Sequence, residues 1–418
     1  MASKKANKDL VVQKYGGSSV ADQASIEKVA ERVISSARSG KKVVVVVSAM
    51  GKSTDELIKL AKKINPEPSE REMDMLVSTG EQVSSSLLAM AIHKRGFDAL
   101  SFTGPQVGII TDTSHTQAKI LKIEADRIKK QLEKGKIIII AGFQGVSTAL
   151  EITTLGRGGS DLSAVALAVS LNAQFCEIYT DVEGIYTTDP RKIKSARKLS
   201  FITFDEMLEL ASSGAQVMHT RAIEVAKKFN LKLHVRSSFS KKEGTIIMEK
   251  PPLIEEVIVR GVTLAEDEAK ITLCDVPDRP GIAAFVFDKL AQTGINIDMI
   301  VQNVSRKKMT DISFTVDADK LKKTISQTKK ISEKIGAGRV ISNKNIAKIS
   351  VVGIGMRSHS GVAARCFSVL AKNKINIDMI STSEISISCL VKKESGKKAL
   401  RILHKEFKLD KKKKRGKR

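Results

Sequence analysis

The chain has 418 residues, enough for two or three domains, with 42% hydrophobic residues, 4% aromatic residues and no tryptophan. No apolar stretch approaches the roughly 20 residues of a membrane-spanning helix, and residues 1–9 lack the apolar core of a secretory signal, so we expect a cytoplasmic protein with no membrane partner. The net charge of +25 indicates a diffuse positive field that suits anionic substrates, with non-specific binding of nucleic acid as the rival interpretation.

The first predicted strand ends in a glycine pair beside a cation, in residues 14–19, Lys-Tyr-Gly-Gly-Ser-Ser. Bare backbone at the end of a strand offers amide N–H groups that can cradle anionic oxygens. Lys14 precedes the glycines closely enough for its ammonium to reach phosphates held there and to stabilise charge on a transferring phosphoryl group. The alternative is a surface lysine that merely ends a strand.

The next 230 or so residues alternate strand and helix patterns. Residues 25–39 repeat apolar side chains at helical spacing and predict an amphipathic helix. Residues 43–47 and 137–140 are continuous β-branched runs, typical of central parallel strands buried on both faces. Gly51-Lys52-Ser53-Thr54 mimics the end of a Walker loop, but Val46 stands where the first glycine of that motif would fall. The alternation predicts a layered α/β domain.

The most informative segment is residues 153–161, Thr-Thr-Leu-Gly-Arg-Gly-Gly-Ser-Asp, between a predicted strand and an Ala/Val/Leu-rich helix. Arg157 supplies a planar fork suited to a carboxylate or phosphate. Asp161 opens the helix and can be explained as no more than an N-cap. A second anion cradle in the same domain indicates two anionic substrates, or one anionic group passed between the cradles.

Turn residues and a repeat organise the rest of the chain. Residues 179–190 are expected to be rich in hairpins, with Asp181, Gly184 and Pro190 as turn markers, and Lys250-Pro251-Pro252 predicts a linker. Twelve of twenty positions are identical between 281–300 and 361–380, which indicates duplication of a small unit. Each copy reads as strand, turn, helix, turn and strand, with the helix opening after the glycine at 281 or 361.

The last residues and the sulfur and imidazole groups offer bland interpretations. Residues 405–418 contain nine Lys/Arg and two acids, a balance of 9 − 2 = +7, typical of a solvated tail, and we expect no specific nucleic-acid partner. The six histidines show no paired metal spacing, so we expect no metal site built by the protein. The cysteines form no C-x-x-C pair and are expected to be buried free thiols: Cys176, Cys274, Cys366 and Cys389.

Three segments, residues 14–19, 154–161 and 180–191, resemble in order the signature segments of the aspartate kinases, and the repeat resembles a tandem pair of ACT domains. The resemblance covers nearly the whole chain. It implies a three-layer αβα amino-acid-kinase domain with a mostly parallel sheet at 1–248, and a linker and strand joining the regulatory region at 249–264. Two ferredoxin-like βαββαβ ACT domains at 265–340 and 341–410 and a basic tail at 411–418 would follow.

The resemblance also assigns roles to residues of the first domain. The catalytic residues would be Lys14, Arg157 and Asp161. The substrate-binding residues, with Glu81 meeting the substrate ammonium, would be Ser48, Thr54, Glu81, Thr154, Arg157 and Ser160. The ATP-binding residues would be Lys14, Tyr15, Gly16, Gly17, Ser18, Thr180, Asp181, Tyr186, Asp189 and Arg191. The family often has a glycine where Leu150 stands, so another turn type is expected in the loop at 146–151.

In the ACT domains the resemblance implies inhibition by lysine, threonine or both, and a homo-oligomer formed through these domains. The effector-binding residues would be Asp278, Gly281, Ala283, Asn296, Ile297, Asp298, Gln302, Val362, Ala363, Asn376, Ile377, Ser381 and Thr382. Some family members make a separate regulatory chain from an internal start, and Met248 is a candidate for one here. No extension of the size of a homoserine dehydrogenase is expected.

The chemistry of such a reaction agrees with the residues found. A side-chain carboxylate with a pKa of about 3.9 is already ionised at neutral pH, so no general base is needed. Bringing it to a triphosphate requires positioning and charge neutralisation, with Mg²⁺ held mainly by the phosphates of ATP and by water. Two alternatives remain: a related kinase acting on glutamate or a similar acid, and an amino-acid sensor that binds RNA and has an inactive kinase domain.

Overall fold

The computed structural model describes residues 7–215, 217–250, 258–303, 308–354, 356 and 361–410. The basic tail expected at 411–418 and most of the Pro251-Pro252 linker lie outside these residues. The chain divides into two compact units, which are described separately. The first unit comprises Met1–Ile185, Lys198–Ala211 and Gln216–Pro252, and the second comprises Tyr186–Arg197, Ser212–Ala215 and Leu253–Arg418.

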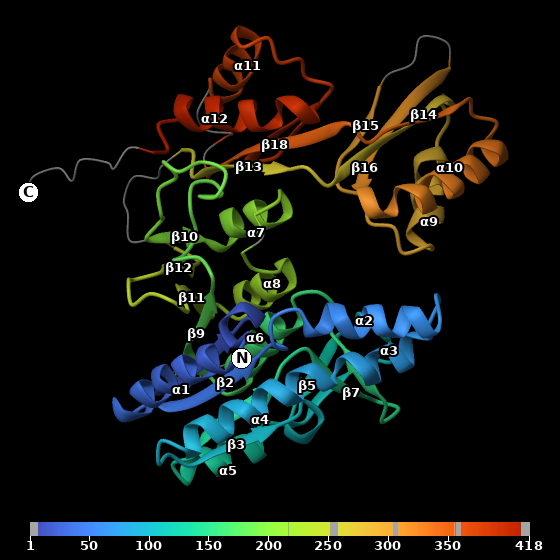
Figure 1. The fold of residues 1–418 in the computed structure, drawn as a ribbon. Coiled ribbons are helices and arrows are strands. Elements are labelled where there is room, and N and C mark those ends of the chain that lie inside the picture. Colours follow the sequence, from blue (N-terminus) through green and yellow to red (C-terminus); the bar gives the residue numbers. More distant parts are fainter. Residues whose placement is uncertain are drawn as a thin grey trace, which may run out of the picture. The chain divides into compact units, whose positions relative to one another are not determined.

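An eight-stranded sheet forms the middle of the first unit, in the order β10-β12-β11-β9-β1-β2-β6-β3 (Figure 1). All neighbouring strands run parallel except β11 and β12. The strands are β1 (Asn7–Tyr15), β2 (Lys42–Val47), β3 (Ala99–Phe102), β6 (Ile137–Ala141), β9 (Ala173–Thr180), β10 (Phe201–Thr203), β11 (Lys232–Ser237) and β12 (Thr245–Met248). Both β-branched runs are therefore central parallel strands, as predicted, and β6 is buried along its whole length.

Helices cover both faces of this sheet because alternate side chains of each strand point to opposite sides. Helices α1 and α4 pack on the face that carries Val43, Val45 and Val47, while α6 packs against β1, β2 and β9. The predicted amphipathic helix is α1, which begins after the Asp22 N-cap. The helices are α1 (Gln23–Arg38), α2 (Ser53–Ile64), α3 (Glu70–Val77), α4 (Thr79–His93), α5 (Asp126–Glu133), α6 (Gly159–Ser170), α7 (Phe204–Ser212) and α8 (Thr220–Lys228).

A smaller sheet in the first unit has the order β5-β4-β7-β8. It consists of β4 (Ile109–Thr111), β5 (Ile120–Ile123), β7 (Gln144–Ser147) and β8 (Ile152–Thr154), and the short 3-10 helices of the unit are η1 (Gly17–Val20) and η2 (Pro105–Val107). Strand β8 leads directly into the glycine-rich loop before α6. The small sheet thus sets the position from which that loop starts.

The second unit contains two four-stranded antiparallel sheets, ordered β15-β16-β14-β17 and β13-β18-β20-β19. The first module runs through β14 (Glu268–Pro277), α9 (Ile282–Ala291), β15 (Ile300–Gln302), β16 (Met309–Asp317), η3 (Ala318–Lys320), α10 (Leu321–Ile335) and β17 (Val340–Asn343). The second contains β18 (Ile346–Val352), α11 (Val362–Lys372), β19 (Met379–Thr382), β20 (Ser386–Lys392), η4 (Lys393–Ser395) and α12 (Gly396–Glu406). Its fourth strand, β13 (Gly261–Ala265), precedes the first module in sequence, which is thereby inserted between β13 and β18.

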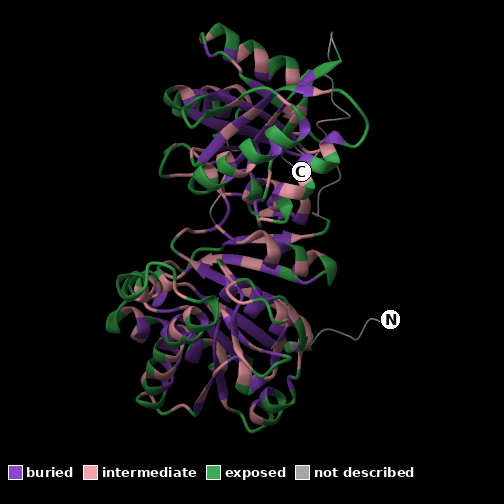
Figure 2. Cartoon of the chain, turned by 90° about the vertical axis from the view of Figure 1, so that its right-hand side faces the viewer, coloured by how far each residue is buried: buried purple, intermediate pink, exposed green. Residues whose placement is uncertain are grey.

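The repeat found in the sequence is also a repeat of environment. The twenty positions 281–300 and their counterparts at 361–380 have the same pattern of burial throughout. In both copies the helix opens directly after a glycine with positive φ, Gly281 or Gly361, as predicted. Figure 2 shows the buried residues concentrated along the strands, with outward helix faces exposed.

These observations confirm the fold class: a mostly parallel sheet with helices, followed by two ferredoxin-like modules. All four cysteines are free and buried, as expected. The hairpin predicted at 179–190 does not form as two strands: the described residues 181–200 are mostly turns and bends, with single bridge residues at Tyr186 and Lys198. Backbone hydrogen bonds from Thr187 to Arg197 and from Leu199 to Ile185 join these bridge residues. Across the described parts of the chain, no helix has the length and apolarity to cross a membrane.

Candidate active site

The centre of the candidate site is an ion pair between the end of β1 and the start of α6. Lys14 Nζ lies 2.7 Å from Asp161 Oδ1, and only 12% and 9% of the two side chains are exposed. Helix α6 is capped by Gly158, whose φ of +70° is left-handed. Asp161 is therefore inside the first turn and is not the N-cap, so the capping interpretation does not account for it.

The glycines after β1 allow the loop after β2 to approach closely. A Cβ atom on Gly17 would lie 2.9 Å from the carbonyl oxygen of Ala49, closer than such atoms can pack. The amide of Gly51 donates to the carbonyl of Gly17 at 3.1 Å, and the amide of Ser48 donates to that of Tyr15 at 3.0 Å. The carboxyl ends of β1 and β2 thus form one continuous rim beside Lys14.

Glu81, in the first turn of α4, brings a second acid to this rim. Its side chain is 3% exposed, and Oε1 accepts a hydrogen bond of 3.2 Å from the amide of Ala49. Oε2 is buried and has no hydrogen-bond partner among the described residues. Burial raises the pKa of Glu81 from its ordinary value of 4.5 to about 7, although the Ala49 amide favours the ionised form. The site therefore contains a carboxylate oxygen ready for a cation.

Arg157 lies exposed on the glycine-rich loop and makes no hydrogen bond or ion pair with any described residue. The loop around it is tightly constrained. Gly156 has a φ of +78°, and a Cβ atom there would lie 2.9 Å from the carbonyl oxygen of Thr116, while one on Gly158 would overlap the ring of His219. A free guanidinium fork on a fixed loop can accept a carboxylate in bidentate fashion.

The remaining substrate-binding candidates are placed differently from one another. Ser48 is half-buried on the rim, and Thr54 is half-buried in the first turn of α2. Ser160 is 7% exposed and packs beside Gly142, at the end of β6. Thr154 is 1% exposed and donates its hydroxyl to Asp74 at 2.5 Å. Its hydroxyl proton is thus committed inside the protein.

Leu150 takes a φ of +64°, the left-handed conformation that favours glycine, and its side chain is 86% exposed. The turn is closed by a hydrogen bond of 2.9 Å from the amide of Leu150 to the carbonyl of Ser147. The backbone at this position is therefore the one a glycine adopts readily, and the change of turn type expected from the leucine is not needed to explain the loop.

Of the ATP-binding candidates, Gly16, Thr180 and Asp181 lie where β1 and β9 end side by side. The amide of Gly16 donates to the carbonyl of Tyr179 at 3.3 Å. Ser18 is exposed in η1. Tyr15 differs, because its ring is fully buried on the α1 face and stacks on Tyr179 with centroids 4.6 Å apart. Any contact of Tyr15 with a nucleotide is confined to its backbone.

Tyr186, Asp189 and Arg191 belong to the second compact unit. Arg191 forms an ion pair with Asp189, with 3.0 Å between Nε and Oδ1. The sequence had grouped these residues with the other nucleotide-binding candidates on the strength of the motif alone.

The effector-binding candidates gather at equivalent places in the two modules of the second unit. Gly281 and Ala283 open α9, and Asn296, Ile297 and Asp298 precede β15; Ala363, Asn376 and Ile377 are the counterparts of Ala283, Asn296 and Ile297, and Val362 is the first residue of α11. Asp278 is exposed at the end of β14, Gln302 ends β15, and Ser381 and Thr382 end β19. Asp298 forms an ion pair with Lys348 of the other module.

Sequence reasoning missed two residues next to the glycine-rich loop. His219, the N-cap of α8, lies against Gly158, and burial together with Arg221 lowers its pKa. Asp74, in α3, is fully buried and bonded to Thr154. Neither stands in a motif, and a lone acid in an amphipathic helix pattern carries no signal of its own.

Family comparison agrees with the division seen in the fold. Residues 9–237 match the amino acid kinase family, and residues 270–333 and 349–407 each match the ACT domain. The aspartate kinase of Stutzerimonas stutzeri (strain A1501) is 48% identical over 402 residues, which cover 96% of this chain and 98% of that protein.

Solved structures are similar over the same extent. The crystal structure of E. coli aspartokinase III in complex with aspartate and ADP (R-state) has a TM-score of 0.82 and 27% identity, covering 95% of this chain and 99% of that one. The same enzyme in complex with lysine and aspartate (T-state) has a TM-score of 0.74 and 27% identity, covering 96% and 100%.

Proposed function

Since the chain belongs to the aspartate kinase family and is an aspartate kinase, we propose that it transfers the terminal phosphoryl group of ATP to the side-chain carboxylate of L-aspartate. The product is 4-phospho-L-aspartate. The observation that carries this proposal is the nearly buried Lys14–Asp161 pair between two glycine-rich loops. Phosphoryl transfer to an ionised carboxylate needs a fixed cation between two anions, and no base.

The charged ends of aspartate would be held by two groups that have no partner among the described residues. The Arg157 guanidinium is free to clamp a carboxylate of aspartate, and the unpaired Oε2 of Glu81 is free to accept a hydrogen bond from its ammonium. Ser48, Thr54 and Ser160 complete the aspartate side of the site. Thr154 serves it from inside the protein, through its bond to Asp74.

ATP would lie along the carboxyl ends of β1 and β9. The amide of Gly16 donates to the carbonyl of Tyr179. The amides of Gly17 and Ser18 at the start of η1 are therefore the donors that we assign to the phosphates. Lys14 then neutralises charge on the transferring group, and Asp161 orients the Lys14 ammonium. Thr180 and Asp181 contribute at the end of β9, and we retain Tyr186, Asp189 and Arg191 as nucleotide-binding residues.

Mg²⁺ would enter with ATP. Among the described residues no three His, Cys, Asp or Glu side chains cluster in a way that could hold a metal ion. We therefore assign its ligands to the phosphates and to water, which suits an ion that dehydrates reluctantly.

The ACT modules would make the enzyme sensitive to lysine, threonine or both. These effectors would bind at the equivalent places in the two modules where the effector-binding candidates gather. A homo-oligomer formed through these modules, a cytoplasmic location and a separate regulatory chain starting at Met248 belong to the same proposal. Met248 is the last residue of β12, so a chain that starts there would omit almost all of the first unit.

The test is ATP-dependent formation of a hydroxamate-trapped acyl phosphate, with L-aspartate and L-glutamate in parallel, each with and without lysine and threonine. We expect product with aspartate and none with glutamate. We expect the amount of product from aspartate to decrease when lysine, threonine or both are added. Equal product with glutamate would contradict the substrate. No product with either acid would contradict the reaction and favour the sensor with an inactive kinase domain.

A further inference from the structure

We propose that Asp74 is a positioning residue for the aspartate side of the active site. It fixes the loop that carries Arg157 without touching a substrate itself. This inference rests on the proposed function, because it explains how the Arg157 fork is held where a substrate carboxylate can meet it. Asp74 lies in α3, outside every segment that carries the family resemblance, and none of it is exposed.

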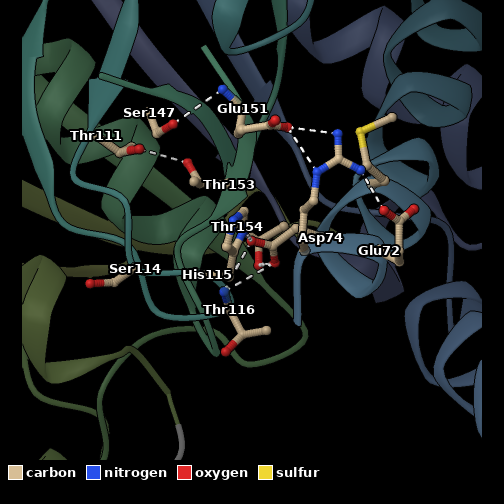
Figure 3. A network of polar contacts seen from close by, with 12 residues as sticks. Glu72, Asp74, Thr111, Ser114, His115, Thr116, Ser147, Glu151, Thr153 and Thr154 are labelled. Carbon is tan, nitrogen blue, oxygen red and sulfur yellow. Dashed lines mark hydrogen bonds and ion pairs between the residues drawn. The ribbon is translucent and has the colours of Figure 1, made fainter. Parts of the chain in front are cut away.

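The Asp74 carboxylate ties together three segments (Figure 3). Oδ1 accepts hydrogen bonds from the hydroxyl of Thr154 at 2.5 Å and from the amide of Thr116 at 3.1 Å. Oδ2 lies 3.0 Å from the same amide and 2.9 Å from Nδ1 of His115. A fully buried carboxylate with four such contacts is expensive to bury and is held in one geometry.

Thr116 transmits this geometry to the glycine-rich loop. Thr116 has a φ of +62°, an unfavourable conformation for a β-branched residue. Its backbone amide donates to the Asp74 carboxylate. Its carbonyl oxygen is the atom against which Gly156 packs. Gly156 is the residue immediately before Arg157, so a turn held by Asp74 forms the wall against which the Arg157 loop rests.

Strand β8 provides the second connection. Thr154, its last residue, is bonded to Asp74 on one side, while Thr153 bonds to Thr111 of β4 on the other, with 2.6 Å between the hydroxyl oxygens. The carbonyl of Thr154 accepts from the amide of Ala118 at 2.9 Å. The start of the loop that carries Arg157 is thus fixed in position and in twist.

The contrast with Arg71 on the same helix shows that the role belongs to Asp74 and not to α3 as a whole. Arg71 lies three residues earlier and pairs with Glu151, with 2.8 Å between Nη2 and Oε2, but 47% of its side chain is exposed. An exposed pair of this kind contributes little. Arg71→Ala is therefore a matched control: it removes a link between α3 and the β7–β8 turn and leaves the buried one intact.

The experiment measures steady-state kinetics and thermal unfolding on the full-length enzyme with Asp74→Asn, Thr154→Val, Thr154→Ser and Arg71→Ala. Asp74→Asn keeps the shape of the side chain but replaces one acceptor oxygen with an NH₂ group, which faces the donors that Asp74 binds. We expect it to lower kcat/KM for aspartate by about 100-fold, chiefly through KM, because displacement of a binding group by about 1 Å has effects of that size. KM for ATP stays at the wild-type value.

The Thr154 variants keep the test valid if Asp74→Asn does not fold. Thr154→Val moves KM for aspartate in the same direction, and Thr154→Ser, which keeps the hydroxyl, recovers most of the loss. Arg71→Ala matches the wild type. The increase in melting temperature that aspartate produces is also smaller in Asp74→Asn than in the wild type. The increase that ADP produces is the same in both.

A residue with only a structural role would lower the melting temperature and the amount of active enzyme, with both KM values unchanged. That result in Asp74→Asn and Thr154→Val, or a parallel rise of both KM values, would overturn the positioning role. A wild-type enzyme that phosphorylates no aspartate would instead overturn the proposed function, so the two failures are distinguishable.

Discussion

In the first unit a nearly buried lysine, Lys14, faces a single carboxylate, Asp161. In the second unit a more deeply buried lysine, Lys348, faces two carboxylates, Glu268 at 2.6 Å and Asp298 from the first module. The pair in the kinase site is balanced, whereas the group around Lys348 carries one excess negative charge when all three side chains are ionised. The exposed fractions also differ: 3% for the Lys348 side chain and 45% for that of Asp298.

This difference matches two kinds of ligand. A balanced pair at the end of a strand can release its cation to a phosphate and keep the acid as the group that orients it. An anionic site with a half-exposed carboxylate at its rim suits a ligand that brings an ammonium, as every free amino acid does. Burial raises the pKa of Glu268 despite the attraction of Lys348, so the excess negative charge at this site is costly without a further cation.

The largest test of the comparison is Lys14→Ala. We expect kcat to fall about 1000-fold, because a preorganised charge stabiliser of the transition state is lost, and thermal stability to fall as well, because Asp161 is left nearly buried without its partner. Rate measurements at saturating ATP and aspartate decide this. If Lys14→Ala kept more than a tenth of the wild-type kcat, Lys14 would be a structural partner of Asp161 and the two lysines would be alike.

The counterpart is Lys348→Met, which leaves two carboxylates facing each other in a largely buried place. Removing one partner of a buried ion pair costs about 3 kcal/mol, and we expect that loss in the unfolding of the second unit, with kcat unchanged in the absence of effector. The double variant Lys348→Met with Glu268→Met should recover most of the stability. Calorimetry and uninhibited rates measure both, and a kcat loss comparable to that of Lys14→Ala would contradict the distinction.

Glu81→Gln tests whether the first unit also needs an unbalanced acid. The folded pKa of about 7 lies above the ordinary 4.5, so the stability that protonated Glu81 provides is fully present below pH 4.5 and is lost as pH rises through 7. The substrate ammonium needs the ionised form, so KM for aspartate should fall as pH rises from 6 to 8.

In Glu81→Gln both pH dependences should flatten, and KM for aspartate at pH 8 should rise about 10- to 100-fold, the range for a lost hydrogen bond to a charged group. KM for ATP provides the control. A wild-type KM for aspartate that is independent of pH would show that Glu81 does not meet the ammonium.

Several features of both units were predictable because their signals are local. Continuous β-branched runs are typical of central strands buried on both faces, and the glycines at 17 and 281 stand where backbone geometry demands them. The period of two along a strand explains the misplaced Tyr15: neighbouring side chains point to opposite faces, so a strand that presents Lys14 to α6 must bury Tyr15 against α1.

What the sequence did not reveal depends on contacts between distant residues. β13 pairs with β18, more than 80 residues later, and a pairing of this range leaves no local pattern. Asp74 is likewise an ordinary acid in α3 until the fold places His115, Thr116 and Thr154 around it. The cross-module bond of Lys348 to Asp298 was hidden for the same reason.

The smallest expected effect, and the sharpest comparison, comes from the repeat itself. Lys270 and Lys348 occupy equivalent places, each between alanine and isoleucine, and each pairs with the aspartate of the other module: Lys270 Nζ lies 3.1 Å from Asp378 Oδ2. At the position of Glu268, however, the second copy has Ile346. Since the Lys270 pair is balanced and more exposed, Lys270→Met should cost no more than about 1 kcal/mol.

Inhibition curves then distinguish the effector-binding places of the two modules. If the excess negative charge draws the effector, Glu268→Gln should weaken inhibition by lysine or threonine more than Lys270→Met does, with the uninhibited kcat equal in both. Ile346→Glu, which gives the second module the acid that the first module has at Glu268, should steepen or strengthen inhibition. Equal effects of Glu268→Gln and Lys270→Met on the inhibition constant would mean that the modules sense by shape alone, and that the buried charge around Lys348 serves only to join them.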